Sequence, residues 1–272
     1  MRIDIRSWPD PAAFIAHLGA VDESKGHVVH GVAHMWLDRP ENFRPGTPLL
    51  TAEADGAAVA AALQASQGKV VFSDGPRDAV LALADWLEAE SRRPLAAVAP
   101  EEAVAGLLTR WPGTRGLETT FYRIDTAPAP TAAPGSLRLA RSDETELLTR
   151  WVAAFNLEAG LPHEPKPRRL VDAKLAAGHL FVWDHDGPRA LAALAGPTPR
   201  AVRINSVYPP EAHRGHGYAS AAVARLAGQE LAAGRAMVTL FADRALPHTN
   251  RMYRKIGFQP LADFADLELS AT

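Results

Sequence analysis

The chain has 272 residues, a formal net charge of −2, 47% hydrophobic and 22% charged residues, and no cysteine. Such a chain is globular and long enough for two domains, and its small net charge favours neither a nucleic acid nor an anionic membrane as partner. The lack of cysteine excludes disulfide bonds, thiolate metal sites and a covalent acyl-cysteine intermediate.

The first residues do not predict a targeting signal. An acid stands at Asp4, no apolar segment of the signal-peptide type follows it, and no apolar run in the chain reaches the length of a membrane span. We therefore expect a cytoplasmic protein.

The first part of the chain, up to about residue 124, alternates the apolar patterns of strands and helices. These patterns predict strands at 28–37, 49–52, 69–72, 95–98 and 119–123, and helices at 59–63, 79–88 and 101–111. This part is therefore expected to form an αβ domain.

Three histidines, His27, His30 and His34, lie on or beside the first of these strands. His30 and His34 would share one face of the strand, and His27 would point to the other. Because no cysteine or nearby carboxylate completes a set of ligands, we expect no metal site here.

Residues 127–135 contain three prolines and a glycine among small residues, which is typical of an extended linker. The sequence therefore predicts a first domain at 1–126, a linker at 127–135 and a second domain at 136–272.

The second domain also alternates strands and helices. Strands are predicted at 137–140, 180–183, 190–195, 202–208 and 237–242, and helices at 143–160, at 168–177, after the glycine-containing loop described next, and at 247–257. With a closing strand, the order is β-α-α-β-β-β-α-β-α-β. We expect an α/β fold whose sheet is mixed, with parallel and antiparallel strands as in α+β proteins.

The strongest signal is the loop between the strand at 202–208 and the next helix, Arg214-Gly215-His216-Gly217-Tyr218-Ala219-Ser220. Glycines let the backbone approach a ligand, and the unpaired N–H groups of a helix's first turn favour an anion such as a pyrophosphate. A dinucleotide-binding fingerprint would need a third glycine at Ser220 and an acid about twenty residues further on that ends the next strand. Residues 235–241 contain no acid, and Asp243 comes a little late. A Walker loop needs Gly-Lys before Ser or Thr, which this sequence lacks.

A second signature follows in the predicted last helix, Asn250-Arg251-Met252-Tyr253-Arg254-Lys255-Ile256-Gly257-Phe258. The two signatures together resemble the GNAT superfamily of acyl-CoA-dependent N-acetyltransferases. In that family the loop carries Arg or Gln, then Gly, then Gly or Ala, at the positions of Arg214, Gly217 and Ala219. The family's late helix carries the residue types found here at Asn250, Tyr253, Gly257 and Phe258. A bare tight turn at the two loop glycines would leave this second signature unexplained.

The resemblance covers about the last half of the chain, from near Ser136, and implies a GNAT fold that uses acetyl-CoA as co-substrate and no metal. Leu246 departs from the pattern, because relatives often carry Asn there, and we expect this to alter packing more than cofactor binding.

The resemblance also implies roles for single residues. Tyr253 would act at the cofactor sulfur, although a core tyrosine is the commoner fate of a helical Tyr. Glu158, near the end of the domain's first helix, is a candidate for the acceptor side, or else an ordinary exposed glutamate. The residues expected to bind the cofactor are Ser206, Val207, Tyr208, Arg214, Gly215, His216, Gly217, Tyr218, Ala219, Ser220 and Asn250.

The first domain contains no glycine loop of this type. It is either a degenerate copy of the GNAT fold that has lost the cofactor and could wall the acceptor pocket, or an unrelated αβ domain. The sequence leaves both interpretations open.

The predicted function is therefore an N-acetyltransferase that moves an acetyl group from acetyl-CoA directly to a primary amine. The alternative is a non-catalytic acyl-CoA-binding or sensing protein, because no general base can be assigned. The acceptor amine, the length of the acyl chain and the oligomeric state remain open.

Overall fold

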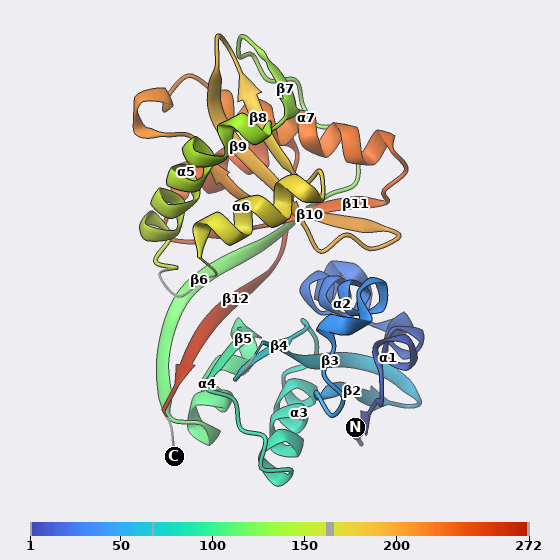
Figure 1. Ribbon diagram of the computed structural model, residues 1–272. Helices are drawn as coiled ribbons and strands as arrows, with labels where there is room; N and C mark the ends of the chain where they lie inside the picture. Colours follow the sequence, from blue (N-terminus) through green and yellow to red (C-terminus); the bar gives the residue numbers. More distant parts are fainter. Residues whose placement is uncertain (1, 67, 162–165, 271–272) are drawn as a thin grey trace. The chain divides into compact units, whose positions relative to one another are not determined.

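The computed structural model describes residues 2–66, 68–161 and 166–270, which form two compact units (Figure 1). The first unit consists of Met1–Phe121, Gly196–Thr198 and Leu261–Thr272, and the second of Tyr122–Ala195 and Pro199–Pro260. Among the helices of the described residues, none combines the length and the apolar character needed to cross a membrane.

The second unit is an α/β structure on a mixed sheet, as the sequence predicts. Its elements in chain order are β7 (Ser136–Leu139), α5 (Thr145–Glu158), α6 (Pro167–Ala176), β8 (Leu180–Asp184), β9 (Pro188–Ala195), β10 (Ala201–Tyr208), α7 (Tyr218–Ala232), β11 (Met237–Asp243) and α8 (Pro247–Ile256). The strands lie in the order β7-β8-β9-β10-β11, and the end of β6 (Gly113–Ile124) lies beside β11. Neighbouring strands from β7 to β10 are antiparallel, whereas β10 and β11 are parallel.

Helices cover both faces of this sheet, α5 and α6 on one and α7 and α8 on the other (Figure 1). Leu148 of α5 packs in one cluster with Leu191 and Ala193 of β9, whereas Val223 of α7 packs in another with Leu194. Successive residues of a strand point to opposite faces, so β9 supplies both clusters by simple alternation.

Local signals place the last helix correctly. Pro247 stands in the first turn of α8, where its missing N–H group costs nothing. Gly257 ends the helix with a φ of +117°, and its N–H group donates to the Tyr253 carbonyl at 3.2 Å.

The first unit is a second α/β structure. Its elements are β1 (Asp4–Ser7), α1 (Pro11–His17), α2 (Glu23–Asp38), β2 (Leu49–Ala54), β3 (Ala57–Ser66), β4 (Lys69–Phe72), α3 (Arg77–Ala89), β5 (Ala96–Pro100), α4 (Glu101–Arg110), the first part of β6, and most of β12 (Gln259–Leu269). The strand order is β1-β2-β3-β4-β5-β12, with β4 and β5 parallel.

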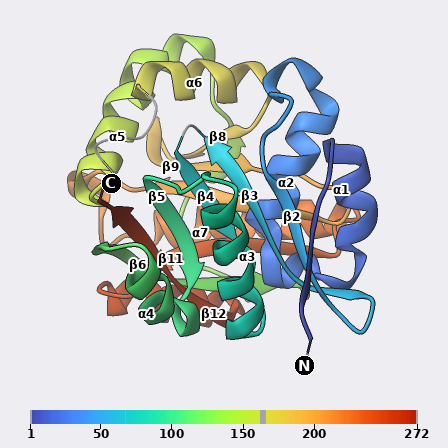
Figure 2. The ribbon, with the colours of Figure 1, turned by 90° about the horizontal axis from the view of Figure 1, so that it is seen from below.

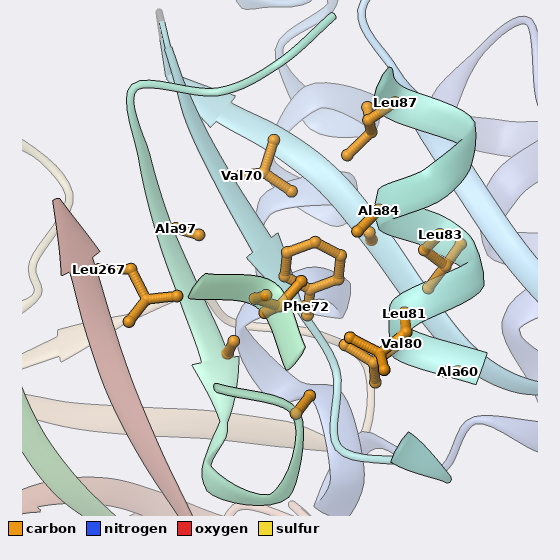
Figure 3. Packing of buried hydrophobic residues seen from close by; sticks show 14 of the residues in the cluster. Ala60, Val70, Phe72, Val80, Leu81, Leu83, Ala84, Leu87, Ala97 and Leu267 are labelled. Atoms are coloured by element: carbon orange, nitrogen blue, oxygen red, sulfur yellow. The ribbon is translucent and has the colours of Figure 1, made fainter. Parts of the chain in front are cut away.

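The core of the first unit lies between its sheet and α3 and α4, which stand in front of the strands in Figure 2. Figure 3 shows Phe72 of β4 and Ala97 of β5 facing Leu83 of α3, with Leu267 of β12 at the edge of the same cluster. The opposite face of this sheet packs against α1 and α2.

Two sequence-based assignments in the first unit are wrong. Residues 59–63, expected as a helix because of their alanines, lie in β3, where Ala60 faces one core and Leu63 the other. A central strand covered on both faces selects small apolar residues, and this context overrides the helix propensity of alanine.

Residues 28–37, expected as a strand because of their valines, lie in α2. Val29, Ala33 and Trp36 recur at helical spacing and pack in one cluster against the sheet. His30 is buried on this helix, where its Nε2 lies 2.7 Å from the Val21 carbonyl and burial lowers its pKa. The described residues hold no group of three His, Cys, Asp or Glu side chains placed to bind a metal.

The two units share one topology. Helices and strands follow the order β-α-α-β-β-β-α-β-α-β in each, from β1 to β6 and from β7 to β12. The parallel pair occupies the same place in both, β4 with β5 and β10 with β11. The final strands are exchanged, because β6 ends in the sheet of the second unit and β12 ends in the sheet of the first.

Because of this exchange, the boundaries of the compact units differ from the domain boundaries at residues 126 and 136 that the linker predicts. Tyr122 and Ile124 at the end of β6 are buried in the core of the second unit, and Phe264–Glu268 of β12 pairs with β5 of the first. The linker residues 127–135 form neither helix nor strand, and the Ala129 N–H group donates to the Ile256 carbonyl at 2.8 Å.

Candidate functional site

The parallel strands β10 and β11 separate after a short paired stretch. In the described part of the chain, their register covers only Ala201–Arg203 opposite Met237–Thr239, although β10 continues to Tyr208 and β11 to Asp243. The second half of each strand therefore borders a gap in the ladder. Ser206, Val207 and Tyr208, which are predicted to bind the cofactor, lie on the β10 side of this gap.

A β-bulge interrupts β10 at this position. Asn205 lies opposite Ala193 and Tyr208 opposite Leu191, so three steps on β10 correspond to two on β9. Ser206 inside the bulge has a φ of +50°. A left-handed conformation is strained for a residue other than glycine, and such strain concentrates at functional sites.

The extra residue reverses which face the end of β10 presents. Ile204, before the bulge, packs on the α7 and α8 face, and strict alternation would send Tyr208 there as well. Tyr208 instead packs with α5 and α6, and its ring lies edge-on to that of Phe155, with 6.5 Å between the ring centroids. The bulge thus brings the Tyr208 hydroxyl to the end of α5.

Tyr208, Glu158 and Arg214 form one polar cluster at that end. The Tyr208 hydroxyl donates to Glu158 Oε1 at 3.0 Å, and Arg214 Nη2 donates to both Glu158 oxygens at 2.9 and 2.7 Å. Burial and the Glu158 carboxylate raise the pKa of Tyr208. Glu158 and Arg214 are about half exposed, so the ion pair contributes little stability, but it fixes the position of both side chains.

The predicted phosphate loop runs from this cluster to the N-terminus of α7. Gly217 is the N-cap residue, with a φ of +79° and no capping side chain. The first recorded helical bond runs from the Ala221 N–H group to the Gly217 carbonyl at 2.9 Å, so the N–H groups of residues 218–220 precede the helical ladder. Gly215, His216 and Gly217 are exposed. This arrangement is an open helix N-terminus suited to an anion.

The side chains beside the loop have bonds of their own. His216 Nδ1 lies 2.9 Å from the Arg214 carbonyl, and its ring stacks on Tyr218. The Tyr218 hydroxyl lies 2.9 Å from His185 Nδ1. Tyr218 is buried, whereas Ala219 and Ser220 are half-buried. The Tyr218 hydroxyl and His216 Nδ1 are thus already engaged within the protein.

Asn250 is tied into the protein by three hydrogen bonds. Its Nδ2 donates to the carbonyls of Asp243 at 2.7 Å and Leu246 at 2.9 Å, and its Oδ1 accepts from the Tyr122 hydroxyl at 2.9 Å. These bonds join the end of β11, the start of α8 and β6. They supply a structural role for Asn250 beside the cofactor contact that the resemblance implies.

Tyr253 lies three residues further along α8 and is only 5% exposed. Its ring packs near those of Tyr122 and Phe258, and Val207 of the bulge packs against the same cluster. Burial raises the pKa of Tyr253, so its hydroxyl stays protonated at physiological pH. Among the described residues, no hydrogen bond is recorded for this hydroxyl.

Two further polar side chains lie on the α5 and α6 face, and the sequence analysis missed both. Asn205 Oδ1 is buried without a hydrogen-bond partner in the described part of the chain. Lys174 of α6 donates to the Leu194 carbonyl, and burial, together with the charge of Arg203, lowers its pKa to about 8. Neither could be found from the sequence, because the burial of each side chain and the face of the sheet on which it lies are set by the fold.

Residues 146–258 match the model of the acetyltransferase (GNAT) family. This segment is a GNAT acetyltransferase domain. It contains the bulge, the predicted phosphate loop and α8, so the resemblance expected from the two signatures is confirmed. A search of curated proteins found no match.

Solved GNAT structures have the fold of the whole chain. A GCN5-related N-acetyltransferase from Sphaerobacter thermophilus superposes with a TM-score of 0.58 at 18% identity, over 99% of this chain and 97% of that one. A GNAT-family acetyltransferase from Colwellia psychrerythraea gives 0.59 at 12% identity, over 98% and 100%. A tandem GNAT protein from the clavulanic acid biosynthesis pathway gives 0.50 at 12% identity, over 98% of each chain. Together with the shared topology, this favours a second copy of the GNAT fold in the first unit.

The first unit differs from the GNAT domain at the place of the predicted phosphate loop. Its β4 joins α3 through Ser73–Pro76, whereas Pro209–Gly217 joins β10 to α7. A Cβ on Gly75 would lie 2.5 Å from the Val59 carbonyl oxygen, so this short link is packed against β3. The first unit has no room at this link for an exposed glycine loop.

Proposed function

We propose that the GNAT domain transfers an acetyl group from acetyl-CoA directly to a primary amine. The observation that carries the proposal is Tyr253, a buried tyrosine for whose hydroxyl no hydrogen-bond partner is recorded among the described residues. The chain has four tyrosines, and Tyr122, Tyr208 and Tyr218 each place the hydroxyl against a protein partner. A ligand atom that accepts a hydrogen bond from the Tyr253 hydroxyl would explain why Tyr253 is kept.

The residues around the gap between β10 and β11 fit acetyl-CoA. We infer that the N–H groups of His216–Ser220 hold the pyrophosphate, with Arg214 beside them, and that the main chain of Ser206–Tyr208 pairs with pantetheine. This inference is supported by the open start of α7 and by the bulge, which frees two residues of β10 from the ladder. The thioester supplies an activated acetyl group.

The protein's part in the reaction is to orient the reactants and stabilise charge. The amine nitrogen forms the C–N bond with the acetyl carbon, the C–S bond breaks with its electron pair on sulfur, and one proton leaves nitrogen for water. The N–H group of Val207 is proposed to stabilise charge on the acyl oxygen. Tyr253 donates a hydrogen bond to the departing sulfur, which strengthens as charge develops there.

Deprotonation of the amine is a separate requirement. An alkyl amine with a pKa near 10.4 is only about one part in a thousand neutral at physiological pH. Glu158 already accepts from Arg214 and Tyr208. Both of its carboxylate oxygens are therefore already engaged in hydrogen bonds within the protein. We therefore propose that Glu158 positions the acceptor side and that water carries the proton away.

The test is release of thiol from acetyl-CoA over a panel of primary amines. The chain has no cysteine, so a thiol-reactive dye reports only the released CoA. Amine-dependent release is expected. Tight binding of acetyl-CoA without release to any amine would instead establish the non-catalytic acyl-CoA-binding protein. The proposal keeps the cytoplasmic location expected from the sequence.

A further inference from the structure

An unpartnered side-chain oxygen lies beside the bulge of β10. Asn205 Oδ1 is buried and has no hydrogen-bond partner among the described residues. Leaving a buried acceptor unpaired is unfavourable, so such an atom in a native structure calls for an explanation. Asn205 directly precedes Ser206, whose positive φ is the strained point of the strand. Two unfavourable features thus fall on neighbouring residues.

Asn205 points to the face opposite the phosphate loop's helix. Val202 and Ile204 pack with α7 and α8, so by alternation Asn205 faces α5 and α6, as does its cross-strand partner Ala193. A cofactor anchored at the start of α7 enters the gap from the α7 and α8 side. The attacking amine then approaches the acetyl carbon from the other side, where Asn205 lies.

We propose that Asn205 orients the acceptor amine, its Oδ1 accepting a hydrogen bond from the amine N–H group. This rests on the function proposed above. An amide oxygen is a hydrogen-bond acceptor and not a useful base at neutral pH, so Asn205 takes no proton. It fixes the direction of the nitrogen lone pair, and its bond strengthens as positive charge develops on nitrogen during attack. A primary amine has a second N–H bond left to lose to water.

The first arm of the test measures stability. Replacing Asn205 with leucine removes an acceptor that has no partner, so the unfolding equilibrium constant should stay within about threefold of the wild type or fall. The matched control is Asn250→Leu, which breaks three hydrogen bonds and should unfold far more readily. If Asn205→Leu unfolds more than tenfold more readily, Oδ1 has a structural partner and the inference is wrong.

The second arm measures kinetics with whichever amine is active. For Asn205→Leu we expect acetyl-CoA affinity within twofold of the wild type and an amine kcat/KM lower by roughly tenfold to hundredfold, the worth of a hydrogen bond to a charged group. Asn205→Asp keeps the acceptor oxygen but adds a charge that favours the ammonium form. Its KM for the amine should fall together with kcat.

The outcomes separate this inference from the proposed function. If the wild type releases thiol and Asn205→Leu has the same kcat/KM for the amine, Asn205 has no orienting role and the function stands. If the wild type releases no thiol with any amine, the proposed function fails and the inference fails with it.

Discussion

Tyr253 and Tyr122 form a matched pair for testing the hydroxyl that carries the proposed function. Their rings lie 6.2 Å apart in one core cluster, and both side chains are buried. The Tyr122 hydroxyl donates to Asn250, whereas Tyr253 has no recorded partner in the described chain. Changing each to phenylalanine keeps the ring and removes one oxygen. We therefore expect Tyr122→Phe to lose stability and Tyr253→Phe to lose activity.

The expected changes in stability follow from those partners. Tyr122→Phe leaves Asn250 Oδ1 buried and unpaired, which costs about 1–3 kcal/mol of unfolding free energy. Tyr253→Phe deletes an oxygen with no partner, so its unfolding free energy should match or exceed that of the wild type. Urea or guanidinium unfolding followed by circular dichroism measures both values.

The kinetic expectation is reversed. Burial raises the pKa of Tyr253 further above that of a thiol, so full proton transfer to sulfur is unfavourable and a hydrogen bond is the main contribution. A hydrogen bond to a charged group contributes about 1.5–3 kcal/mol, which corresponds to roughly a tenfold to hundredfold loss of kcat in Tyr253→Phe. Acetyl-CoA affinity and the kcat of Tyr122→Phe should change little.

The assay is steady-state thiol release beside calorimetric binding of acetyl-CoA. A Tyr253→Phe kcat within twofold of the wild type, with chemistry shown to be rate-limiting, would refute the role at sulfur. Loss of stability in this variant equal to that of Tyr122→Phe would also refute it, because the hydroxyl would then have a structural partner.

Three further outcomes test the cofactor site. Gly217→Val should lower acetyl-CoA affinity by about tenfold or more, because a branched side chain at a φ of +79° distorts the start of α7. The control is Gly234→Val, at a φ of +98° beyond the other end of α7. Both variants should lose about 1–2 kcal/mol of unfolding free energy, but Gly234→Val should keep its acetyl-CoA affinity. Equal affinity losses in both would remove the phosphates from this loop. Arg214→Gln should weaken acetyl-CoA binding by about tenfold or more, as loss of a contact to a charged phosphate does, while Glu158→Gln leaves it within twofold; the reverse order, measured by calorimetry, would contradict the assignment. Calorimetry should also give one acetyl-CoA per chain, because Gly75 and its neighbours close the equivalent link in the first unit, and a stoichiometry of two would contradict this.

Short-range signals in the sequence were sufficient to predict the strands and helices around the loop of the GNAT domain. The glycines of the loop, Pro247 and Gly257 each fix a backbone conformation that depends on few neighbours, so the strand, loop and helices around them are found where they were expected. The site residues of the loop were predicted from the same signals, and their roles stay a prediction.

Features set by distant parts of the chain could not be predicted. The alanines of β3 are buried by helices on both faces, and the valines of α2 pack by a helical stripe, so local composition was misleading in both segments. The bulge at Ser206 turns Tyr208 to the opposite face of the sheet, where its hydroxyl joins Glu158 and Arg214 in one cluster. A one-residue insertion in a strand leaves no mark in the residue pattern before the sheet is known.

The exchanged final strands affect the order in which the protein can be made. Ala265, Leu267 and Leu269 of β12 complete the core of the first unit, yet they are synthesised only after all the elements from β7 to α8. At 5–20 residues per second, β5 waits on the order of 10 s for its neighbour. Until then its open edge and apolar cluster are accessible to other chains. The first unit is therefore expected to finish folding only after β12 has been synthesised, and to need protection from aggregation before that.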